Sequence, residues 1–485
     1  MSISRPVAFQ ALQRAPLAAC LLAALGIAVT YSLPASASPP VDRERTVPFR
    51  MPTYLRPHAR ASSSGHPFVT NGSHLVTNCN DSGPGSLRDV IGDPTTVSGD
   101  TINLSQLSMT CSRITLGGTA VHINQDSLYL KGPASGILTI DANGQSSDFY
   151  HYGAGTVYAT NLTITHGEYT SNFPRGGCIY SKGSLYLTNS IVSDCSITST
   201  SAGGAALGGA IYVIGDLTLK GSTVTGSHAT ATAGAQAYGG GAYVAGSLDA
   251  EYSTISDNAA TAASAHAYGG GAYTKGNVFL YSTTVSGNRA DSGGGMFIAS
   301  GPTTPSADIW NSTISSNVAF SVGGGISSMI SATFRSSTIA FNQAPNNVSS
   351  NGAGVWIGNG LLDSISTIIA DNSSAAGPSD LYVFSGNTAG FNNLILSSNV
   401  YPAGTISACP QLQPLADNGG LTRTHALGLA SPAIDAGIDP IGFPRDQRAA
   451  SRFSGSFVDI GSVERQATDA DERIFASGFD GVCDR

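Results

Sequence analysis

The chain has 485 residues, a formal net charge of −8 and only 11% charged residues, but 59 glycines. A negative net charge argues against nucleic acid as a partner, because binding to phosphates needs a surplus of Lys and Arg. With so few charges, Ser, Thr and Asn must supply most of the wetted surface.

The first 37 residues have the pattern of a secretory signal. Arg5 and Arg14 precede an apolar run from Ala15 to Val29, no acidic residue is present, and the segment ends in Ala-Ser-Ala at Ala37. This pattern predicts export and cleavage after Ala37, which would change the net charge from −8 to −10. No other segment reaches the ~18 to 20 apolar residues of a membrane span, so we expect no transmembrane segment in the mature chain.

A leader and an N-terminal cap are predicted next. Residues 38–66 are rich in Pro, Arg and Ser without an apolar period, which predicts a flexible leader. Within the predicted cap, residues 67–101, a short helix is expected at Ser86–Ile91, with Ser86 as N-cap and Asp89 in the capping-box position. The surrounding segment NCNDSGPGSLRDVI resembles the N-terminal module of bacterial CSLREA-type β-helix proteins, with Gly-Ser-Leu-Arg-Asp in place of Cys-Ser-Leu-Arg-Glu.

The middle of the chain contains an internal repeat. Four copies align without gaps at Gly183, Gly215, Gly246 and Gly276, which are 32, 31 and 30 residues apart. Apolar residues alternate two and four places after each glycine, as expected of a half-buried strand, and a third apolar column lies nine places after it. The columns are Leu185, Leu217, Leu248 and Val278; Leu187, Leu219, Ala250 and Leu280; and Val192, Val224, Ile255 and Val285.

These columns predict a coiled β-solenoid over residues 102–400. A strand that recurs with every copy, with no helical pattern between copies, must stack in parallel on its own copy in the next turn. The Gly-Gly-Ala-Ile and Gly-Gly-Gly-Ala starts resemble right-handed parallel β-helix (pectin-lyase-like) proteins and the repeats of polymorphic outer-membrane proteins. The resemblance implies an all-β, right-handed parallel β-helix.

The linkers between copies are mostly Ala, Thr, Ser and Gly. They include Ser199–Leu207, Ala229–Tyr238 and Ala259–Tyr268, and we predict loops laid along one flank. Glycine triplets at 239–241 and 269–271 suit positive-φ bends where successive turns approach closely.

Six cysteines remain once Cys20 leaves with the signal. An even number in an exported chain predicts up to three disulfides. Cys178 and Cys195 lie 17 residues apart, in the glycine-start and Asn-end columns, and are predicted to pair within one coil. Cys79 and Cys111 flank the predicted helix and are candidates to pin it to the first coil. The others are Cys409 and Cys483.

Residues 401–466 resemble the choice-of-anchor Q domain of bacterial surface proteins. The matching segments, in order, are Pro414–Leu427, Ser431–Gly437, Asp446–Arg448 and Asp459–Glu464. The resemblance implies a capping module that closes the β-helix before an anchoring tail, residues 467–485, and it implies no enzymatic activity. Four carboxylates here, with Arg448, are a conceivable site, but we favour a network of turn and salt-bridge contacts. They are Asp435, Asp446, Asp459 and Glu464.

An enzyme of this architecture would need catalytic side chains for which the sequence gives little indication. A hydrolase needs two carboxylates about 5 to 10 Å apart, yet the chain has no Asp-Asp pair, and Thr165-His166-Gly167 is the nearest approach to a Gly-His-Gly segment. A lyase needs a Lys or Arg base, and cations are scarce between His151 and Val400. No histidine spacing indicates zinc. We therefore assign no catalytic, cofactor-binding or metal-binding residue and expect no cofactor.

An aromatic column follows the inward residues of the repeat. It comprises Tyr180, Tyr212, Tyr243, Tyr273, Phe297 and Trp356, interrupted by Ser327. Strand alternation puts it on the outer face, together with Lys182 and Lys275. An exposed ladder would stack sugar rings. The other interpretation is that the Ala-rich linkers fold over the rings and bury them.

The sequence as a whole predicts an exported surface or secreted binding protein that contacts glycans or cell surfaces, a monomer associated with the outer membrane through its C-terminal segment. A polysaccharide lyase or glycoside hydrolase of the pectin-lyase-like fold is the first alternative. A non-catalytic structural spacer is the second.

Overall fold

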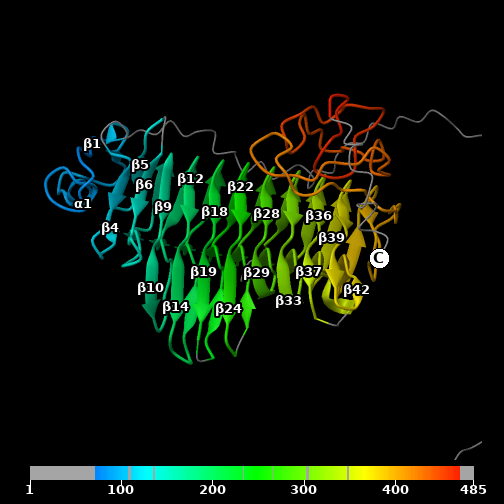
Figure 1. Ribbon diagram of the computed structural model, residues 1–485, viewed down its shortest axis with the longest axis horizontal. Helices are drawn as coiled ribbons and strands as arrows, with labels where there is room; N and C mark the ends of the chain where they lie inside the picture. Colours follow the sequence, from blue (N-terminus) through cyan, green and yellow to red (C-terminus); the bar gives the residue numbers. More distant parts are fainter. Residues whose placement is uncertain are drawn as a thin grey trace, which may run out of the picture. The chain divides into compact units, whose positions relative to one another are not determined.

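The computed structural model describes residues 71–107, 111–134, 137–232, 234–264, 266–301, 305–346 and 349–469, all of which belong to one compact unit, Phe68–Arg485. They form a parallel β-solenoid in which each coil passes through up to four sheets in turn (Figure 1). The predicted signal, the leader, Cys483 and all but the first three residues of the predicted tail lie outside the described residues.

Two of the sheets, A and B, form adjoining walls. Sheet A contains β1 (Ser73–Leu75), β2 (Thr101–Asn103), β5 (Leu128–Lys131), β8 (Thr156–Thr160), β12 (Ser184–Thr188), β17 (Leu217–Lys220), β22 (Leu248–Glu251), β27 (Val278–Tyr281), β31 (Ala307–Trp310), β35 (Ala332–Arg335), β39 (Gly360–Ile365) and β44 (Gly386–Ala389). Sheet B contains β3 (Arg113–Thr115), β6 (Leu138–Asp141), β9 (Leu162–Thr165), β13 (Ile191–Ser193), β18 (Thr223–Thr225), β23 (Thr254–Ser256), β28 (Thr284–Ser286), β32 (Thr313–Ser315), β36 (Thr338–Ala340), β40 (Ile368–Ala370) and β45 (Leu394–Ile395).

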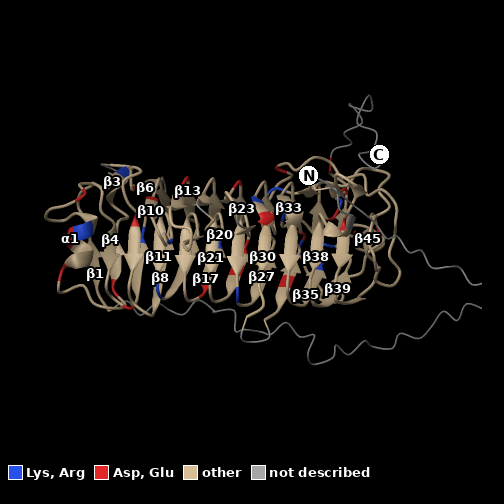
Figure 2. Cartoon of the chain, turned by 90° about the horizontal axis from the view of Figure 1, so that it is seen from below, with Lys and Arg blue, Asp and Glu red and all other residues tan. Residues whose placement is uncertain are grey.

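The other two sheets are C and D. Sheet C contains β4 (Val121–Ile123), β7 (Phe149–His151), β11 (Ile179–Ser181), β16 (Ile211–Val213), β21 (Ala242–Val244), β26 (Ala272–Thr274), β30 (Met296–Ile298), β34 (Ile326–Ser328), β38 (Val355–Ile357) and β43 (Leu381–Val383). Sheet D contains β10 (Glu168–Ser171), β14 (Ser196–Ser199), β19 (His228–Ala231), β24 (Ala259–Ala262), β29 (Arg289–Ser292), β33 (Val318–Val322), β37 (Gln343–Ala344), β41 (Ser373–Ser374) and β42 (Gly377–Pro378), and also β15 (Ala205–Leu207), β20 (Gln236–Tyr238) and β25 (Ala267–Tyr268). In the view of Figure 2, charged residues are scattered singly along the strands.

The predicted all-β parallel β-helix is confirmed. Leu185, Leu217, Leu248 and Val278 pair in register along sheet A, and the third predicted apolar column does so along sheet B. Every pairing between the named strands is parallel except that of β41 with β42. The period of the sequence therefore sets the register, because each residue stacks on its counterpart one coil away.

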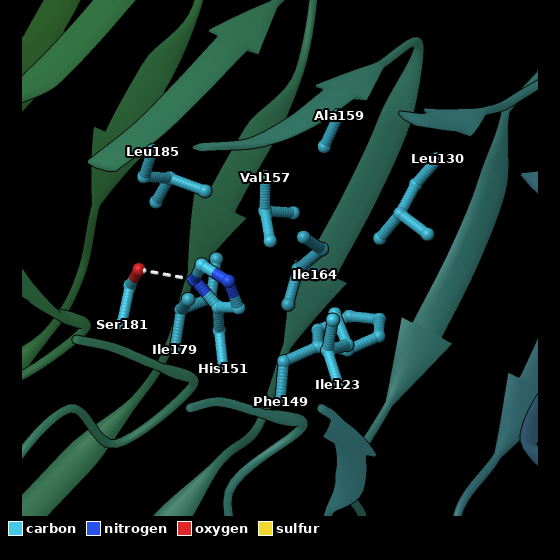
Figure 3. Close-up of a pocket in the computed structure, with 10 residues that line it drawn as sticks. All are labelled: Ile123, Leu130, Phe149, His151, Val157, Ala159, Ile164, Ile179, Ser181 and Leu185. Atoms are coloured by element: carbon cyan, nitrogen blue, oxygen red, sulfur yellow. Dashed lines mark hydrogen bonds between the residues drawn. The ribbon is translucent and has the colours of Figure 1, made fainter. Parts of the chain in front are cut away.

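A single apolar core fills the space enclosed by sheets A, B and C, from Val76 to Ile395. One polar side chain inside it is His151, whose Nδ1 lies 2.7 Å from Ser181 Oγ (Figure 3). The cavity beside this pair holds only about 10 Å³ and is lined by apolar residues such as Phe149 and Ile164. Burial lowers the pKa of His151. We interpret the pair as a satisfied interior contact, because so small a cavity admits no ligand.

A ladder of buried asparagines lines the corner between sheets B and D. Asn258, Asn288, Asn317, Asn342 and Asn372 stack one per coil. From Asn288 onward, each Oδ1 accepts hydrogen bonds from the backbone N–H and the Nδ2 of the asparagine in the preceding coil, at 2.8 to 3.0 Å. Asn258 Oδ1 accepts from the backbone N–H of Ser227. A glycine faces each amide. A Cβ added at Gly271 would lie 3.0 Å from Asn288, which explains the repeated Gly.

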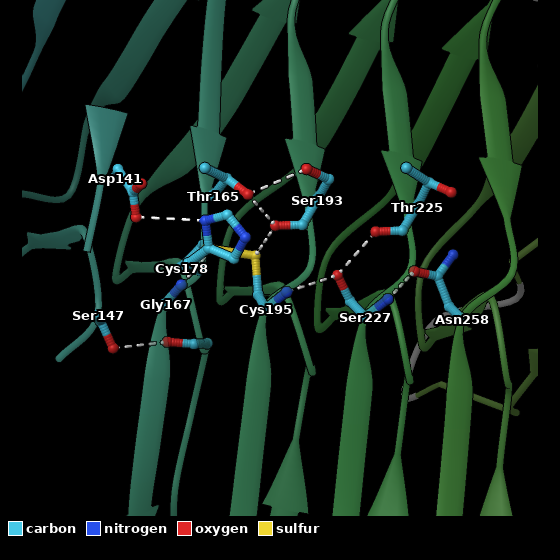
Figure 4. The surroundings of a disulfide bond; sticks show 12 residues. Asp141, Ser147, Thr165, Gly167, Cys178, Ser193, Cys195, Thr225, Ser227 and Asn258 are labelled. Carbon is cyan, nitrogen blue, oxygen red and sulfur yellow. Dashed lines mark hydrogen bonds and ion pairs between the residues drawn. A yellow bond between two sulfur atoms is a disulfide. The ribbon is translucent and has the colours of Figure 1, made fainter. Parts of the chain in front are cut away.

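The predicted disulfide between Cys178 and Cys195 is confirmed and occupies this same corner, with a Cα–Cα distance of 5.6 Å (Figure 4). Both residues are fully buried. Cys178 stands in the glycine column and Cys195 in the asparagine column, where the backbone N–H of Cys195 donates to Ser227 Oγ. The covalent bond thus replaces the Gly–Asn contact in one coil.

The Ala-rich linkers are strands, so the prediction of loops is wrong. Strands β14, β19 and β24 lead outward, and β15, β20 and β25 lead back. We call these six strands the fin. Small side chains, mainly Ala, pack between its two layers. They are Ile197, Ala206, Ala229, Ala231, Ala235, Ala237, Ala260, Ala267 and Ala290. Alanine allows the layers to approach closely, although its strand propensity is low.

At the N-terminal end, the predicted helix is present as α1 (Leu87–Gly92). Ser86 is its N-cap, and the Ser86 side chain accepts a hydrogen bond from the backbone N–H of Asp89. Leu87 and Ile91 are buried in the main core. The Cys79–Cys111 disulfide, with a Cα–Cα distance of 6.3 Å, joins the two sides of the helical segment as predicted. Among the described helices, none has the length and hydrophobicity needed to cross a membrane.

The C-terminal segment, residues 409–469, lies along the outer face of sheet B over β28 to β40 (Figure 1). Thr284 Oγ1 donates to the backbone oxygen of Arg423 at 2.6 Å, and Thr313 Oγ1 donates to Gln447 Oε1 at 2.6 Å. The last strands instead receive bridges from residues 398–406. Removing the chain from Pro414 onward would therefore uncover a side wall, and not the last strand edges as the capping prediction assumes.

Candidate functional site

An aromatic ladder runs along the outer face of sheet C. Parallel register puts Tyr150, Tyr180, Tyr212, Tyr243, Tyr273 and Phe297 in one column. From Tyr180 to Phe297, neighbouring ring centroids are 5.1 to 5.6 Å apart and the ring planes differ by 6° to 13°. Ser327 interrupts the column before Trp356, as the sequence predicts.

The middle of this ladder is buried, so the interpretation of an exposed sugar-stacking ladder is wrong there. Tyr212, Tyr243, Tyr273 and Phe297 are only 6 to 8% exposed. Two fin tyrosines cover them edge-on, with the ring of Tyr238 5.0 Å from that of Tyr273, and the ring of Tyr268 5.0 Å from that of Phe297. Burial raises the pKa of Tyr273. The fin, built from the linkers, has turned the ladder into a second core.

Stacking also makes the ring faces inaccessible to a ligand. In the central coils each ring lies nearly parallel to its neighbours, so its two faces contact the rings of the adjacent coils and only its edge points outward. A sugar stacks on an aromatic face. The central ladder would therefore be a poor sugar platform even without the fin.

The N-terminal end of the column differs in both respects. His122, Tyr150, Tyr152, Tyr169 and Tyr180 form what we call the open aromatic cluster. Tyr152 is 46% exposed and Tyr169 is 38% exposed. Tyr150 meets Tyr169 at 84° and Tyr180 at 39°, with centroids 6.4 and 5.4 Å apart. His122 meets Tyr152 at 83° and 5.6 Å. The ring of Tyr152 is nearly parallel to that of Tyr150, at 13° with centroids 6.1 Å apart. Since Tyr152 and Tyr169 are both more than a third exposed, part of the cluster remains open to solvent.

The C-terminal end of the column is also open. Trp356 and Phe384 lie 6.1 Å apart at 29°, and Phe384 is 69% exposed. A Cβ added at Gly358 would lie 2.6 Å from the indole ring, so the glycine lets Trp356 rest flat against the backbone. Met329 borders the same contact, with its sulfur 2.9 Å from that added Cβ. We call Trp356 and Phe384 the terminal aromatic pair.

Three carboxylates and a histidine line an open hollow of about 390 Å³ at the corner between sheets B and D. Asp141 is its least exposed member and pairs with Arg113, while His166 Nδ1 lies 3.3 Å from Asp141 Oδ1. Glu168 and Asp194 are exposed at the rim. Exposed carboxylates beside a histidine can serve as acid and base. In the part of the chain that the structure describes, no group of three His, Cys, Asp or Glu could hold a metal ion.

The four carboxylates of the C-terminal segment bind backbone N–H groups. Asp459 accepts from Asp435 and Arg465, and Glu464 accepts from Asp459. Asp446 pairs with Arg448 at 3.0 Å. These contacts hold irregular turns together around the buried guanidinium of Arg452. Burial raises the pKa of Glu464 to about 7. The arrangement offers no open surface to a substrate, because all but Asp435 are at most 2% exposed.

Several candidate residues escaped the sequence reasoning. The hollow unites Asp141, His166, Glu168 and Asp194 from three successive coils, and only His166 had been singled out. Tyr152 and Phe384 each lie two residues after a member of the aromatic column, on the same face of sheet C. Their regular spacing from Tyr150 and Tyr382 was a usable signal, since residues i and i+2 share a face.

The comparisons with known proteins add little about activity. No family model matches the chain, and no curated protein does. The chain is similar to the crystal structure of pectate lyase Pel9A, at 14% identity over 70% of this chain and 88% of that one, with a TM-score of 0.33.

Proposed function

We propose that this is an exported binding protein whose ligand is a glycan, held at the open aromatic cluster. The observation that carries the proposal is the difference in exposure between the central aromatic ladder and the rings gathered at its N-terminal end. In the middle the rings are buried and stacked, whereas Tyr152 and Tyr169 expose 46% and 38% of their surface. Side chains with an apolar body and a polar tip, clustered and tilted, suit sugars, which also present apolar faces and polar edges.

The setting of the cluster favours carbohydrate over an apolar ligand. Lys182 lies beside Tyr152 on the next coil, where its backbone N–H donates to the oxygen of His151. Exposed Lys and His side chains supply hydrogen-bond donors around the rings. The cluster also sits on strands of a rigid solenoid, so little conformational entropy is lost when a ligand binds.

Export and surface attachment complete the proposal. The two disulfides are typical of proteins that fold in an oxidising compartment. The signal pattern at residues 1–37 supports secretion. The resemblances at residues 67–101 and 401–466 support a cap and an anchoring module of a bacterial surface protein, associated with the outer membrane. We also propose that the protein acts as a monomer.

The test is a glycan array probed with the purified mature chain, followed by titration of the best ligand. Tyr152→Ala combined with Tyr169→Ala should weaken binding at least tenfold, because removing one stacked aromatic ring costs about 1 kcal/mol or more. Tyr252→Ala is the matched control, since Tyr252 is 37% exposed and lies at the corner between sheets A and B. Equal binding by the double variant and the wild type would refute the assignment.

A second candidate function is glycoside hydrolysis at the hollow, which the grouping of Glu168, Asp194 and His166 favours. One rim carboxylate would protonate the leaving oxygen, and the other would activate water or attack the sugar. A reducing-sugar assay on the same ligands tests it, because hydrolysis frees a new reducing end, whereas unsaturated uronate would indicate elimination by a lyase instead. Glu168→Gln and Asp194→Asn should each abolish any product formed. Turnover that survives both changes would exclude the hollow.

A further inference from the structure

A row of positions aligned by the register connects the two open ends of sheet C, and two of its members, Ala299 and Gly358, are buried. Each member follows the last residue of a sheet C strand, and its backbone N–H donates to the strand of the preceding coil. Parallel register therefore aligns the row along the solenoid. We call it the lane. Its members are Tyr152, Lys182, Ile214, Ala245, Lys275, Ala299, Met329, Gly358 and Phe384.

The lane begins and ends in exposed rings. Tyr152 belongs to the open aromatic cluster, and Phe384, 69% exposed, belongs to the terminal aromatic pair. Eight coil steps separate these two residues, which corresponds to about 38 Å at the ~4.8 Å strand spacing. The fin covers the neighbouring ladder, whereas Ile214 in the lane remains 42% exposed. Ala299 is buried, so a ligand would pass over that point without contacting its side chain.

The charge of the lane is positive although that of the chain is negative. Lys182 and Lys275 are exposed and lie three coils apart, or about 14 Å. Neither forms a salt bridge within the described residues, and Lys275 Nζ stands 5.6 Å above the ring of Tyr243. No lane residue is acidic. The nearest carboxylate in sequence, Asp216, accepts the backbone N–H of Ser247.

From this arrangement we propose that the lane binds a single extended, anionic glycan chain along the solenoid axis, held at both aromatic ends and over the two lysines. The inference rests on the proposed glycan function and deepens it, because it assigns the ligand as a polymer with carboxylate or sulfate groups. Two contacts on one rigid wall make the second binding event intramolecular. Affinity must then rise sharply once the chain is long enough to span the ends.

The experiment measures affinity against chain length with defined probes. Hyaluronan, alginate and heparin oligomers shorter than about 20 Å or longer than about 40 Å would be titrated into the full mature chain, with chitin oligomers as the neutral series. We expect the long form of at least one acidic glycan to bind at least tenfold more tightly than its short form, and more tightly than chitin of equal length.

Variants separate the parts of the lane. Phe384→Ala should remove the gain from length and leave short-chain binding unchanged. Lys182→Gln with Lys275→Gln should weaken long-chain binding and flatten its dependence on salt. The matched controls are Phe453→Ala, 63% exposed on the C-terminal segment, and Lys131→Gln on sheet A. Circular dichroism melting should be the same for all variants.

The outcomes distinguish this inference from the proposed function. If long and short acidic chains bind equally, if none binds, or if Phe384→Ala keeps the gain from length, the lane proposal is overturned. If the chain binds only a neutral glycan, and the Tyr152→Ala, Tyr169→Ala variant does not, the proposed site at the open aromatic cluster is supported and the lane proposal is overturned. A length effect that persists in that double variant would also overturn the lane proposal, because the gain would then not depend on a contact at the N-terminal end.

Discussion

The middle coils and the end coils of this solenoid both carry aromatic side chains on the outer face of sheet C, but they use them for different purposes. In the middle, the ring of Tyr243 is 7% exposed and stacked on both sides. At the N-terminal end Tyr152, two residues beyond the column, is 46% exposed, nearly perpendicular to the ring of His122 and nearly parallel to that of Tyr150. The backbone is alike in both places. What differs is the connection between sheets D and C, which contains the strands β15, β20 and β25 in the middle, whereas the connection nearer the N-terminal end, residues 172–178, contains no strand.

The asparagine ladder shows the same contrast. In the middle each amide has a partner in both neighbouring coils, as Asn288 has in Asn258 and Asn317. At the C-terminal end the ladder stops at Asp380, whose Oδ1 takes the place of an amide oxygen for Asn372. In the middle of a solenoid, repetition gives each buried polar group a hydrogen-bond partner in the next coil. At each end a different residue has to supply that partner. The ends are therefore where new chemistry is found.

The largest effect should come from the middle of the ladder. Tyr243→Ala with Tyr273→Ala should destabilise the fold by about 6 kcal/mol, because truncating one buried aromatic side chain costs about 3 to 5 kcal/mol and the two share contacts. Urea unfolding followed by circular dichroism measures this. Glycan binding by the remaining folded protein should not change. An unaltered melting temperature would mean that the rings are not core residues.

A smaller loss is expected from the middle of the asparagine ladder. Asn288→Ala removes the acceptor for the backbone N–H and the Nδ2 of Asn258, which are both buried. Leaving such donors unsatisfied should cost about 3 kcal/mol in the free energy of unfolding. The control is Asn277→Ala, because Asn277 is exposed and accepts a single hydrogen bond, from Ser306. The two variants should differ by at least ~1 kcal/mol.

The end of that ladder should be sensitive to pH. Burial raises the pKa of Asp380 to about 7, so its neutral form is favoured in the folded state. The unfolded carboxyl loses its proton near pH 4, and the stability contributed by the neutral form is therefore lost as pH rises from about 4 to 7. We expect a loss of roughly 3 kcal/mol over this range, since one pKa unit corresponds to about 1.4 kcal/mol.

Asp380→Asn isolates this contribution. The variant should lose that part of the pH dependence, and subtracting its curve from that of the wild type removes the contribution of Asp371, whose pKa burial raises to about 6. Chemical denaturation at pH 4, 5.5 and 7 would show the difference. Parallel curves for the two proteins would rule out Asp380 as the titrating group.

The smallest effect on stability is expected at the N-terminal end. Tyr152→Ala with Tyr169→Ala should change the free energy of unfolding by about 1 kcal/mol or less, since both rings are already partly in water. Thermal melting beside the Tyr243→Ala, Tyr273→Ala variant measures this. A loss of unfolding free energy as large as that of the Tyr243→Ala, Tyr273→Ala variant would contradict the proposed difference between the buried central rings and the open rings at the N-terminal end.

Much of the fold was predictable because every coil of a solenoid repeats the same pattern of residues. The apolar columns at Leu185 and Val192, their parallel register and the Cys178–Cys195 bond all follow from the period, since each residue stacks on its counterpart. The site was not predictable to the same degree. The aromatic column was found, but its exposure depends on the fin. Its strands alternate mainly Ala with polar residues, as in β19, which is a weaker apolar signal than the Leu and Val columns of the coils.

The sequence by itself determined the period, and with it the parallel coils, the inward and outward faces, the aromatic column and the corner disulfide, because all of these depend on spacing along the chain. Only the tertiary structure decided which outward faces are covered. The fin buries Tyr243 and leaves Tyr152 open, and residues 409–469 cover sheet B over β28 to β40. Covering one face with another requires long-range packing between segments, and no local pattern encodes it.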